Sequence, residues 1–416
     1  MGRAKLTTTD YAQRWPRSLR AAAKQAALTG AEYEPVVIRM GFKAAARQLE
    51  EVTGSAPITL VKDNYDEQLA ELLLSRNAQL YRASPAIQQE SISSFLASHY
   101  GSTEPWQMGS WVYYPWSGYL VHLLEEELFT ESRTIRNKNL ITAPEQATYA
   151  DFRVGCLGMS VGSSAAVALI LQGGSRHITI ADHAVLSGSN LNRIRTGVSS
   201  VGDEKATVIA RQLYEMDPYI TVTKWTEQVA QATLERFFTQ PQPLQCVVDE
   251  IDDLEVKVRL RVEARRRGIP VLMATDLGDN VMLDIERFDL NPTLPLFHGL
   301  AGDIEAVLSK KDMTQRHWLK YANMIIGNKN VPLRLQQSLL QIGQTLPTQP
   351  QLGGTAQMAG GVIAYAVRML ALGQPLKSGR TNISLDHHLL QGHRSIRNQM
   401  QHRRHTRILK KALDSM

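Results

Sequence analysis

Residues 152–171 read FRVGCLGMSVGSSAAVALIL: an apolar run, a glycine turn, and a run of small and apolar residues. This order predicts a strand over 152–157, a turn over 158–163 and a helix over 164–171. The first N–H groups of such a helix have no intrahelical partners and can bind a phosphate. Asp182 ends the next apolar run, about 20 residues after the last glycine, where a ribose hydroxyl is bound in dinucleotide sites. The stretch therefore predicts a nucleotide site in an α/β sheet.

The turn has the pattern G-x-S-x-G, made by Gly158, Ser160 and Gly162. This pattern is weak by itself, because a tight turn with close helix packing uses the same residues. The polar residues that follow Asp182 strengthen the prediction: Asn190, Arg193 and Lys205. An amide and two cations on one side of a site suit a triphosphate better than a nicotinamide dinucleotide.

Length and composition are those of an ordinary globular protein. The chain has 416 residues, of which 43% are hydrophobic and 21% charged, enough for one large domain and a smaller one. We find no apolar run long enough to span a membrane and no signal-peptide pattern at the N-terminus, so we expect a cytoplasmic protein. Cys156 and Cys246 both lie in apolar, strand-like runs and are predicted to be buried thiols. Two cysteines cannot form a four-cysteine zinc site, so no structural zinc is expected.

The net charge of +6 is concentrated at the C-terminus. From residue 387 onward there are seven lysines and arginines, five histidines and one acidic residue. Such a run is either a solvated terminal helix or a docking surface for an acidic peptide. Nucleic acid is disfavoured as a partner, because no aromatic residues are interleaved with the charges.

The remaining periodicity divides the chain into three predicted parts. Residues 1–105 form a small α+β module for recognition or positioning, residues 106–380 the nucleotide-binding domain, and residues 381–416 a basic helical tail. Within the module we expect strands over 36–40 and 58–61 and helices over 43–52, 63–80 and 87–98. Residues 106–116 hold three of the six tryptophans and are predicted to be a packed domain junction, with a short helix over 122–129.

A second group of polar residues follows the apolar run 246–249. This run predicts a buried strand that places Glu250, Asp252 and Asp253 at its carboxyl end, the edge where open α/β sheets bind ligands. Carboxylates there either hold Mg²⁺ or cap the next helix, expected over 254–267. Asp253 suits the cap and Asp252 the metal. Further on, the glycine-rich run 353–361 is predicted to lead into a helix over 362–371.

Taken in order, these motifs resemble those of the ThiF/MoeB, or ubiquitin-activating, superfamily of adenylating enzymes. The resemblance runs from about Arg133 to Leu376 and rests on Arg133-x-x-Arg136, the glycine turn, Asp182, Ser189-Asn190-Leu191-Asn192-Arg193, Gly202-x-x-Lys205, Asp217-Pro218, Asp249-x-x-Asp252 and Gly268-Ile269-Pro270. It implies a doubly wound, Rossmann-like mixed sheet, a homodimer, and the use of ATP and Mg²⁺.

Roles for single residues follow from these matches. Gly158, Ser160 and Gly162 form the turn in which the backbone approaches the nucleotide, and Asp182 binds the ribose. Asn190, Arg193 and Lys205 bind the phosphates, and Asp252 holds Mg²⁺. The resemblance also implies that Arg136 reaches the γ-phosphate of the partner subunit's ATP. We count Arg193, Lys205, Asp252 and Arg136 as the candidate catalytic residues.

The chain departs from the superfamily pattern in several places. The usual G-x-G-G-x-G is one residue shorter, Ala184 stands where a second aspartate is frequent, and the paired C-x-x-C zinc motifs are missing. No cysteine follows Pro270, which disfavours thioester transfer of a ubiquitin-like protein. Within the superfamily the chain looks most like the branch with an extra N-terminal domain, similar to enzymes that modify precursor peptides in pantocin-type antibiotic biosynthesis.

The predicted reaction is ATP-dependent adenylation of a carboxylate on a peptide, with release of pyrophosphate, in the maturation of a ribosomal-peptide antibiotic. The partner is then an acidic precursor peptide. One alternative is adenylation of the C-terminal glycine of a small ubiquitin-like sulfur-carrier protein in cofactor biosynthesis. The other is a non-adenylating NAD(P)-binding redox partner.

Overall fold

The structure, a computed structural model, describes residues 32–309 and 315–415. It divides into two compact units, with the boundary in the chain between Ile135 and Arg136. The sequence-based division placed this boundary between residues 105 and 106. The difference arises because two strands after residue 106 pair with strands of the N-terminal module.

The first unit is built on a four-stranded sheet with the order β1-β3-β4-β2. The strands are β1 (Val36–Arg39), β2 (Leu60–Asp63), β3 (Ser110–Tyr114) and β4 (Tyr119–Leu123). β3 is antiparallel to β1 and β4, while β2 runs parallel to β4. Residues 110–114, which we predicted to lie in a domain junction, are therefore a central strand. The helix predicted over 122–129 begins only at Glu126, because His122 and Leu123 belong to β4.

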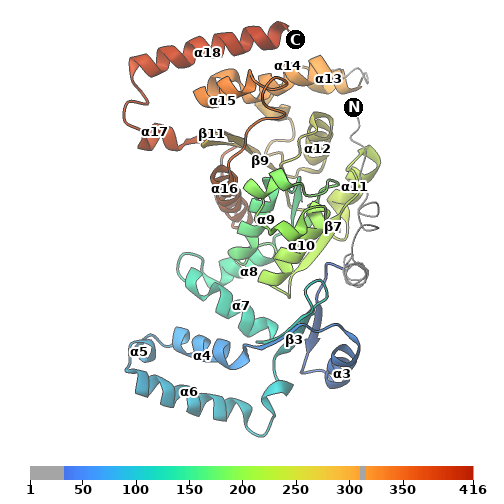
Figure 1. Cartoon of the computed structure of the whole chain (residues 1–416), viewed down its shortest axis with the longest axis vertical. Coiled ribbons are helices and arrows are strands. Elements are labelled where there is room, and N and C mark those ends of the chain that lie inside the picture. The colour runs from blue at the N-terminus through green and yellow to red at the C-terminus, as the bar shows by residue number, and fades with distance from the viewer. Residues whose placement is uncertain (1–31, 310–314, 416) are drawn as a thin grey trace, which may run out of the picture. The chain divides into compact units, whose positions relative to one another are not determined.

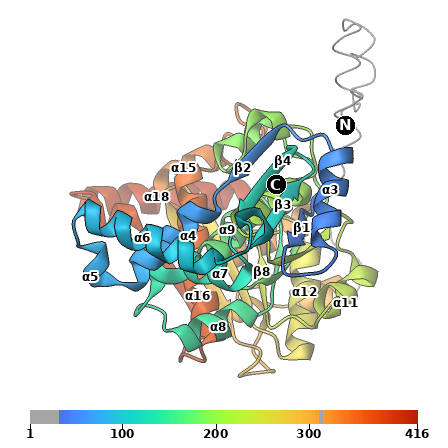
Figure 2. The same cartoon turned by 90° about the horizontal axis from the view of Figure 1, so that it is seen from below.

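Five α-helices accompany this sheet within residues 32–135. They are α3 (Ala45–Ser55), α4 (Tyr65–Arg76), α5 (Ala78–Tyr81), α6 (Pro85–Tyr100) and α7 (Glu126–Thr134). Figure 2 shows α3 beside β1 and β3, with α4 and α6 on the side of β2. The buried His122 ring stacks between Trp111 and Tyr65, with ring centroids 4.4 and 4.9 Å away. Aromatic stacking of this kind fixes the helix layer on the sheet.

The second unit contains a seven-stranded sheet with the order β11-β10-β9-β8-β5-β6-β7. Its strands are β5 (Val154–Leu157), β6 (His177–Ala181), β7 (Thr221–Trp225), β8 (Cys246–Asp249), β9 (Val271–Leu277), β10 (Asn280–Glu286) and β11 (Gly379–Ser384). The first five run parallel to one another, and β10 and β11 extend the sheet antiparallel. The predicted doubly wound mixed sheet is confirmed, and both cysteines are buried in it, as expected.

Helices cover both faces of this sheet. The α-helices in the described part of the second unit, some of which pack on other helices and not on the sheet, are α8 (Ala143–Asp151), α9 (Gly162–Leu171), α10 (Lys205–Met216), α11 (Gln231–Thr239), α12 (Leu254–Arg267), α13 (Ile304–Ser309), α14 (Gln315–Ile326), α15 (Leu333–Leu339), α16 (Gly353–Ala371), α17 (Leu385–Leu389) and α18 (Ile396–Ser415). In Figure 1, α16 and α12 lie on opposite sides of β9. No helix in the described ranges is long and apolar enough to cross a bilayer.

Two segments near the C-terminus differ from the predictions. The glycine-rich run 353–361 is not a turn before a helix but the first half of α16. Its glycines serve close packing, since a Cβ on Gly360 would lie 2.4 Å from the Ser164 carbonyl oxygen of α9. The tail predicted over 381–416 is not separate from the sheet either, because residues 379–384 form its edge strand β11.

Candidate nucleotide site

The glycine turn that follows β5 has a backbone shape that a side chain would prevent. Gly158 has φ +85°, and a Cβ there would lie 2.3 Å from the Glu250 carbonyl oxygen. The Gly158 N–H donates to the Ala181 carbonyl at 2.8 Å, which fixes the turn to the end of β6. α9 then begins at Gly162 after Val161, a residue without a side-chain acceptor for the first N–H groups. The turn and helix terminus therefore form a cradle that fits a phosphate group.

We expect Gly158→Ala to abolish nucleotide binding or folding of the second unit, because the added Cβ meets backbone in a left-handed conformation. Gly188→Ala is the matched control, since a Cβ at Gly188 meets no atom within 4 Å. Thermal unfolding and binding of a fluorescent ATP analogue would be measured for both variants. Equal behaviour of the two would contradict this account of the turn.

Asp182, at the end of β6, lies against the same turn. Its carboxylate accepts hydrogen bonds from the Met159 and Ala184 N–H groups, each at 2.8 Å. Lys205, the first residue of α10, places its Nζ 3.9 Å from an Asp182 oxygen. The structure thus brings Gly158, Asp182 and Lys205 together, as predicted. The Asp182 carboxylate also stabilises the turn through these hydrogen bonds. Its contact with a ribose remains a prediction.

Arg193 also contacts the glycine turn. Its Nε donates to the Ser160 Oγ at 2.9 Å, so the departure from a glycine at position 160 supplies a partner for the guanidinium. Asn190 is buried and its Oδ1 accepts from the Ser187 N–H at 3.0 Å, which closes the turn that carries Arg193. Asn190 therefore shapes the loop here, and its phosphate contact stays a prediction.

Two roles were predicted for the carboxylates after β8, a helix cap and a metal ligand, and the structure shows the cap. Asp253 caps α12, because its Oδ1 accepts from the Val256 N–H at 3.1 Å. Asp252 is exposed and lies in the electrostatic range of Arg193. The described residues contain no group of three or more His, Cys, Asp or Glu side chains that could hold a metal. Mg²⁺ binding by Asp252 is therefore still a prediction, in which phosphate oxygens would supply the other ligands.

The sequence analysis named Glu250 among the carboxylates after β8, but it missed a second buried acid at the site, Asp276. Asp276, near the end of β9, is 8% exposed, and burial raises its pKa against the opposing effect of Arg193. Burial also raises the pKa of Glu250 well above its usual value, and its Oε1 accepts from the Ala274 N–H at 2.7 Å. Asp276 lies inside an apolar run far along the chain, so its position could not be predicted before the order of the strands was known.

The Arg193 guanidinium is half-buried beside the glycine turn, within the electrostatic range of Asp276 and Asp252. Burial lowers its pKa, while Asp276 and Asp252 act in the opposite direction. A half-buried guanidinium interacts more strongly with a bound phosphate than an exposed one would. Arg136, by contrast, is exposed in the short helix Ile135–Asn137. Its predicted role concerns a partner subunit and remains a prediction.

Comparison with known proteins gives one family and several similar chains. The model of the ThiF family matches residues 132–385. A protein of Mycobacterium tuberculosis (strain CDC 1551 / Oshkosh), described as uncharacterized protein MT1398, is 37% identical over 275 residues. The match covers 66% of this chain and 38% of that protein, so the chain spans well under half the length of this relative.

Solved structures of low identity are also similar. A crystal structure of E. coli MccB with succinimide has 16% identity and a TM-score of 0.43, covering 58% of this chain and 63% of that one. The PaaA structure has 16% identity and a TM-score of 0.46, covering 63% and 81%. E. coli tRNA N6-threonylcarbamoyladenosine dehydratase, TcdA, has 19% identity and a TM-score of 0.40, covering 58% and 95%.

The range matched by the family contains the residues of the candidate site. The matched region includes the glycine turn, Asp182, Arg193, Lys205 and Asp252, all in the second unit. It covers more than half of the chain and confirms the resemblance inferred from the ordered motifs. This chain belongs to the ThiF family.

Proposed function

We propose that the protein is an adenylating enzyme that activates a carboxylate of a peptide with ATP in the cytoplasm. The observation that carries the proposal is the placement of two cations at one glycine turn. Arg193 is hydrogen-bonded to Ser160 of the turn, and Lys205 lies beside Asp182, which holds the turn. Membership of the ThiF family supports the same activity.

The reaction follows from these groups. A substrate carboxylate oxygen forms a bond to the α-phosphorus of ATP while the bond to the bridging oxygen breaks, and pyrophosphate leaves with the electron pair. Arg193 and Lys205 stabilise the negative charge that develops on the phosphates, and the N-terminus of α9 binds one of them. Mg²⁺, held by Asp252 together with phosphate oxygens, would supply further charge neutralisation. A second nucleophile then attacks the acyl carbon and AMP leaves.

We propose an acidic precursor peptide as the substrate, in the maturation of a peptide antibiotic, and a homodimer in which Arg136 serves the partner's site. The basic C-terminal segment supports an acidic partner by charge complementarity. Adenylation of a ubiquitin-like sulfur carrier is the second candidate, because it needs the same nucleotide site. Binding of NAD(P) is disfavoured by the two cations at the turn.

ATP–pyrophosphate exchange tests the proposal. Wild-type protein is expected to show exchange that depends on an added Glu- and Asp-rich peptide. Asp252→Ala should lower the exchange rate about 10²–10³-fold if Asp252 helps to stabilise the transferred phosphoryl group. Asp253→Asn is the control, because Asp253 is the neighbour of Asp252 and asparagine can still cap the helix.

Two results would count against this function. Exchange that is unchanged in Asp252→Ala would remove Asp252 from the reaction. Absence of exchange with peptides and with sulfur carriers, together with tight binding of NAD(P), would replace adenylation with the redox alternative.

A further inference from the structure

A cavity of about 1190 Å³ lies in the second unit, apart from the glycine turn. Its walls are the β9–β10 turn, the edge strand β11, the segment 329–335 with α15, and helices α17 and α18. We call it the C-terminal cavity. Among the described residues that line the cavity, neither Arg193 nor Lys205 is found. Its volume exceeds that of ordinary small-molecule pockets, so it can accept a chain segment.

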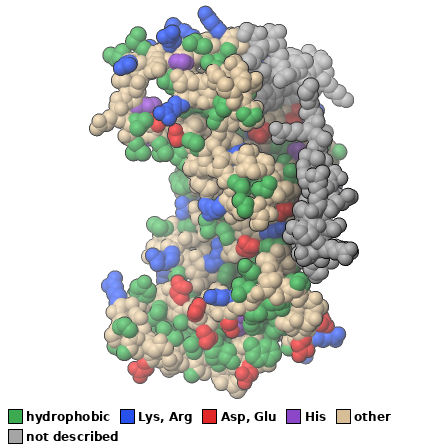
Figure 3. All heavy atoms as spheres, in the orientation of Figure 1, with side chains coloured by type: hydrophobic (Ala, Val, Ile, Leu, Met, Phe, Trp, Pro, Cys, Tyr) green, Lys and Arg blue, Asp and Glu red, His purple; other side chains and the backbone are tan. Residues whose placement is uncertain are grey.

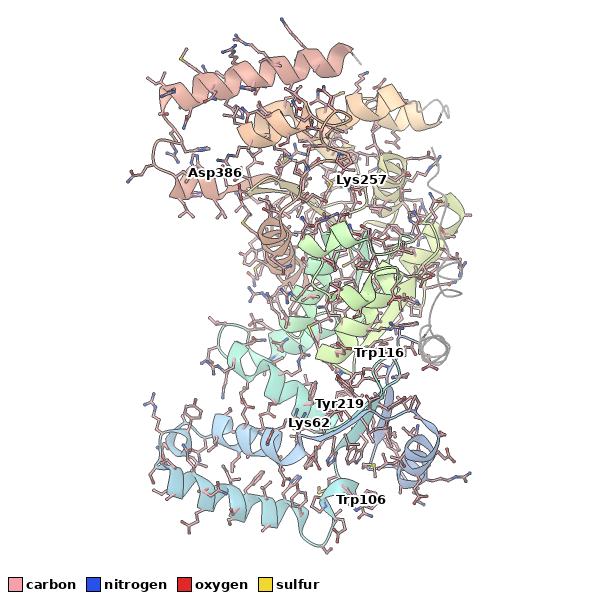
Figure 4. All side chains as sticks on the ribbon, viewed as in Figure 1. Lys62, Trp106, Trp116, Tyr219, Lys257 and Asp386 are labelled. Carbon is pink, nitrogen blue, oxygen red and sulfur yellow. The ribbon has the colours of Figure 1, made fainter. Side chains whose placement is uncertain are left out.

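The lining of the C-terminal cavity is strongly basic. It holds four permanent cations, three histidines and two carboxylates: Lys329, Arg334, Arg394, Arg403, His387, His393, His402, Asp279 and Asp386. All four cations are exposed. Within residues 32–309 and 315–415, none of the four has an ion pair with a carboxylate. Figure 3 shows Lys, Arg and His side chains gathered over α17 and α18, and Figure 4 labels Asp386 on α17.

The walls of the cavity are tied to the sheet. Gln336 of α15 is fully buried, and its Nε2 lies 3.0 Å from the Thr406 Oγ1 and 3.1 Å from the His402 Nε2 of α18. β11 pairs with β10 along its whole length. The basic side chains are therefore presented from fixed elements, which reduces the entropy lost when a partner binds.

The cavity borders the nucleotide site. β5, β8 and β9 are parallel, so the turns that follow them lie at one edge of the sheet. The Thr355 hydroxyl of α16 donates to the Gly278 carbonyl in the β9–β10 turn at 2.5 Å. Two residues earlier, Gly353 packs against the Asn192 carbonyl, where a Cβ would lie 2.3 Å away. The start of α16 thus contacts both the cavity wall and the residue next to Arg193.

Apolar side chains accompany the charges. Leu390 lines the cavity and is 59% exposed. Pro332 and Leu333 also line it and are partly exposed. A free phosphate or nucleotide would leave these side chains in water. A peptide with acidic and apolar residues would cover them and pair with the cations.

We propose that the C-terminal cavity binds an acidic, partly apolar segment of the peptide substrate and leads its reactive carboxylate past the β9–β10 turn to the nucleotide site. This inference rests on the proposed adenylation of a peptide and adds where that peptide is held. It assigns substrate recognition to the basic C-terminal helices of the second unit.

Fluorescence anisotropy with a fluorescein-labelled Glu- and Leu-rich peptide tests the proposal, with a Lys- and Leu-rich peptide of equal length as the charge control. The double variant Arg394→Glu/Arg403→Glu reverses two lining charges. Arg404→Glu/Arg407→Glu makes the same charge change on α18 at residues that do not line the cavity. We expect the lining variant to bind the acidic peptide roughly ten- to a hundred-fold more weakly, and the control variant to bind within about twofold of wild type.

Lys329→Glu, on the opposite wall, provides a second lining variant if the double variant does not fold. Equal weakening in the lining and control variants would overturn the proposal, because general charge would then explain binding. A change from dimer to monomer in sedimentation, with peptide binding unchanged, would also overturn it and make the cavity a subunit interface. Peptide binding is measured without ATP. Absence of ATP–pyrophosphate exchange in the wild type and in all variants would therefore refute adenylation, while the binding result would still test the cavity.

Discussion

Replacing Arg193 with alanine is expected to lower the rate of peptide-dependent ATP–pyrophosphate exchange by about 10²–10³-fold, since one preorganised charge donor is lost from the transition state. The guanidinium is half-buried, is held by the Ser160 hydroxyl at 2.9 Å, and lies near two acids, Asp252 and Asp276. Its effect on phosphate charge is therefore larger than that of an exposed arginine. The exchange rate and the affinity for ATP would be measured separately.

Arg195→Ala is the matched control for this prediction. Arg195 lies two residues further along and is hydrogen-bonded to the Gln357 Oε1 at 2.6 Å, away from the glycine turn. Its removal should change exchange by less than about threefold, because the hydrogen bond that is lost joins Arg195 to Gln357 and not to Ser160 or Asp182. If both variants lost activity equally, the loop as a whole, and not the Arg193 charge, would be responsible.

Arg261→Met is expected to destabilise the second unit by about 3–5 kcal/mol, because removing one partner of a buried ion pair leaves an uncompensated charge. Arg261 on α12 is fully buried and pairs with Asp249 and Glu286, each at 2.5 Å. Its guanidinium also lies 4.0 Å from the centre of the Phe297 ring. Lys257, labelled in Figure 4, adds a second cation 3.2 Å from Asp249.

Urea unfolding followed by circular dichroism measures this effect. Arg259→Met is the control, since Arg259 lies on the same helix and forms an exposed i,i+4 pair with Glu255, which is worth at most about 1 kcal/mol. The same loss of unfolding free energy in both variants would show that the buried network contributes no more than a surface pair. Asp249 directly precedes the carboxylates of the site, so the network also fixes where β8 ends.

Local patterns were sufficient for most of the second unit. The helix α12 begins and ends where its cap and apolar spacing predicted, and the run 246–249 is the buried strand β8. These elements succeed because each is specified by neighbouring residues. The strands β3, β4 and β11 were missed. β3 and β4 pair locally with each other, but their other partners, β1 and β2, and the partner of β11, β10, lie far away in the chain. A strand of four to six residues has no local signal that outweighs an aromatic cluster or a basic tail.

The candidate site also contains residues that local patterns predict and a residue that they do not. The turn residues, Asp182, Arg193 and Lys205 could be predicted, because each follows a strand or turn at a spacing that nucleotide sites share. Glu250 could be placed at the carboxyl end of its strand, but Asp276 could not be placed near the turn, since its position there depends on β8 and β9 lying side by side. The C-terminal cavity is a still clearer case, as its lining comes from three separate stretches of the chain.

The sequence by itself determined the parallel α/β class, the nucleotide turn and the family, because glycine geometry, helix caps and short spacings are set within a few residues. Only the tertiary structure decided which acids face Arg193, that the aromatic segment is a central strand, and that the C-terminal segment closes the sheet and walls a basic cavity. These features depend on strand order and long-range pairing, which bring together residues whose separation along the chain carries no local signal.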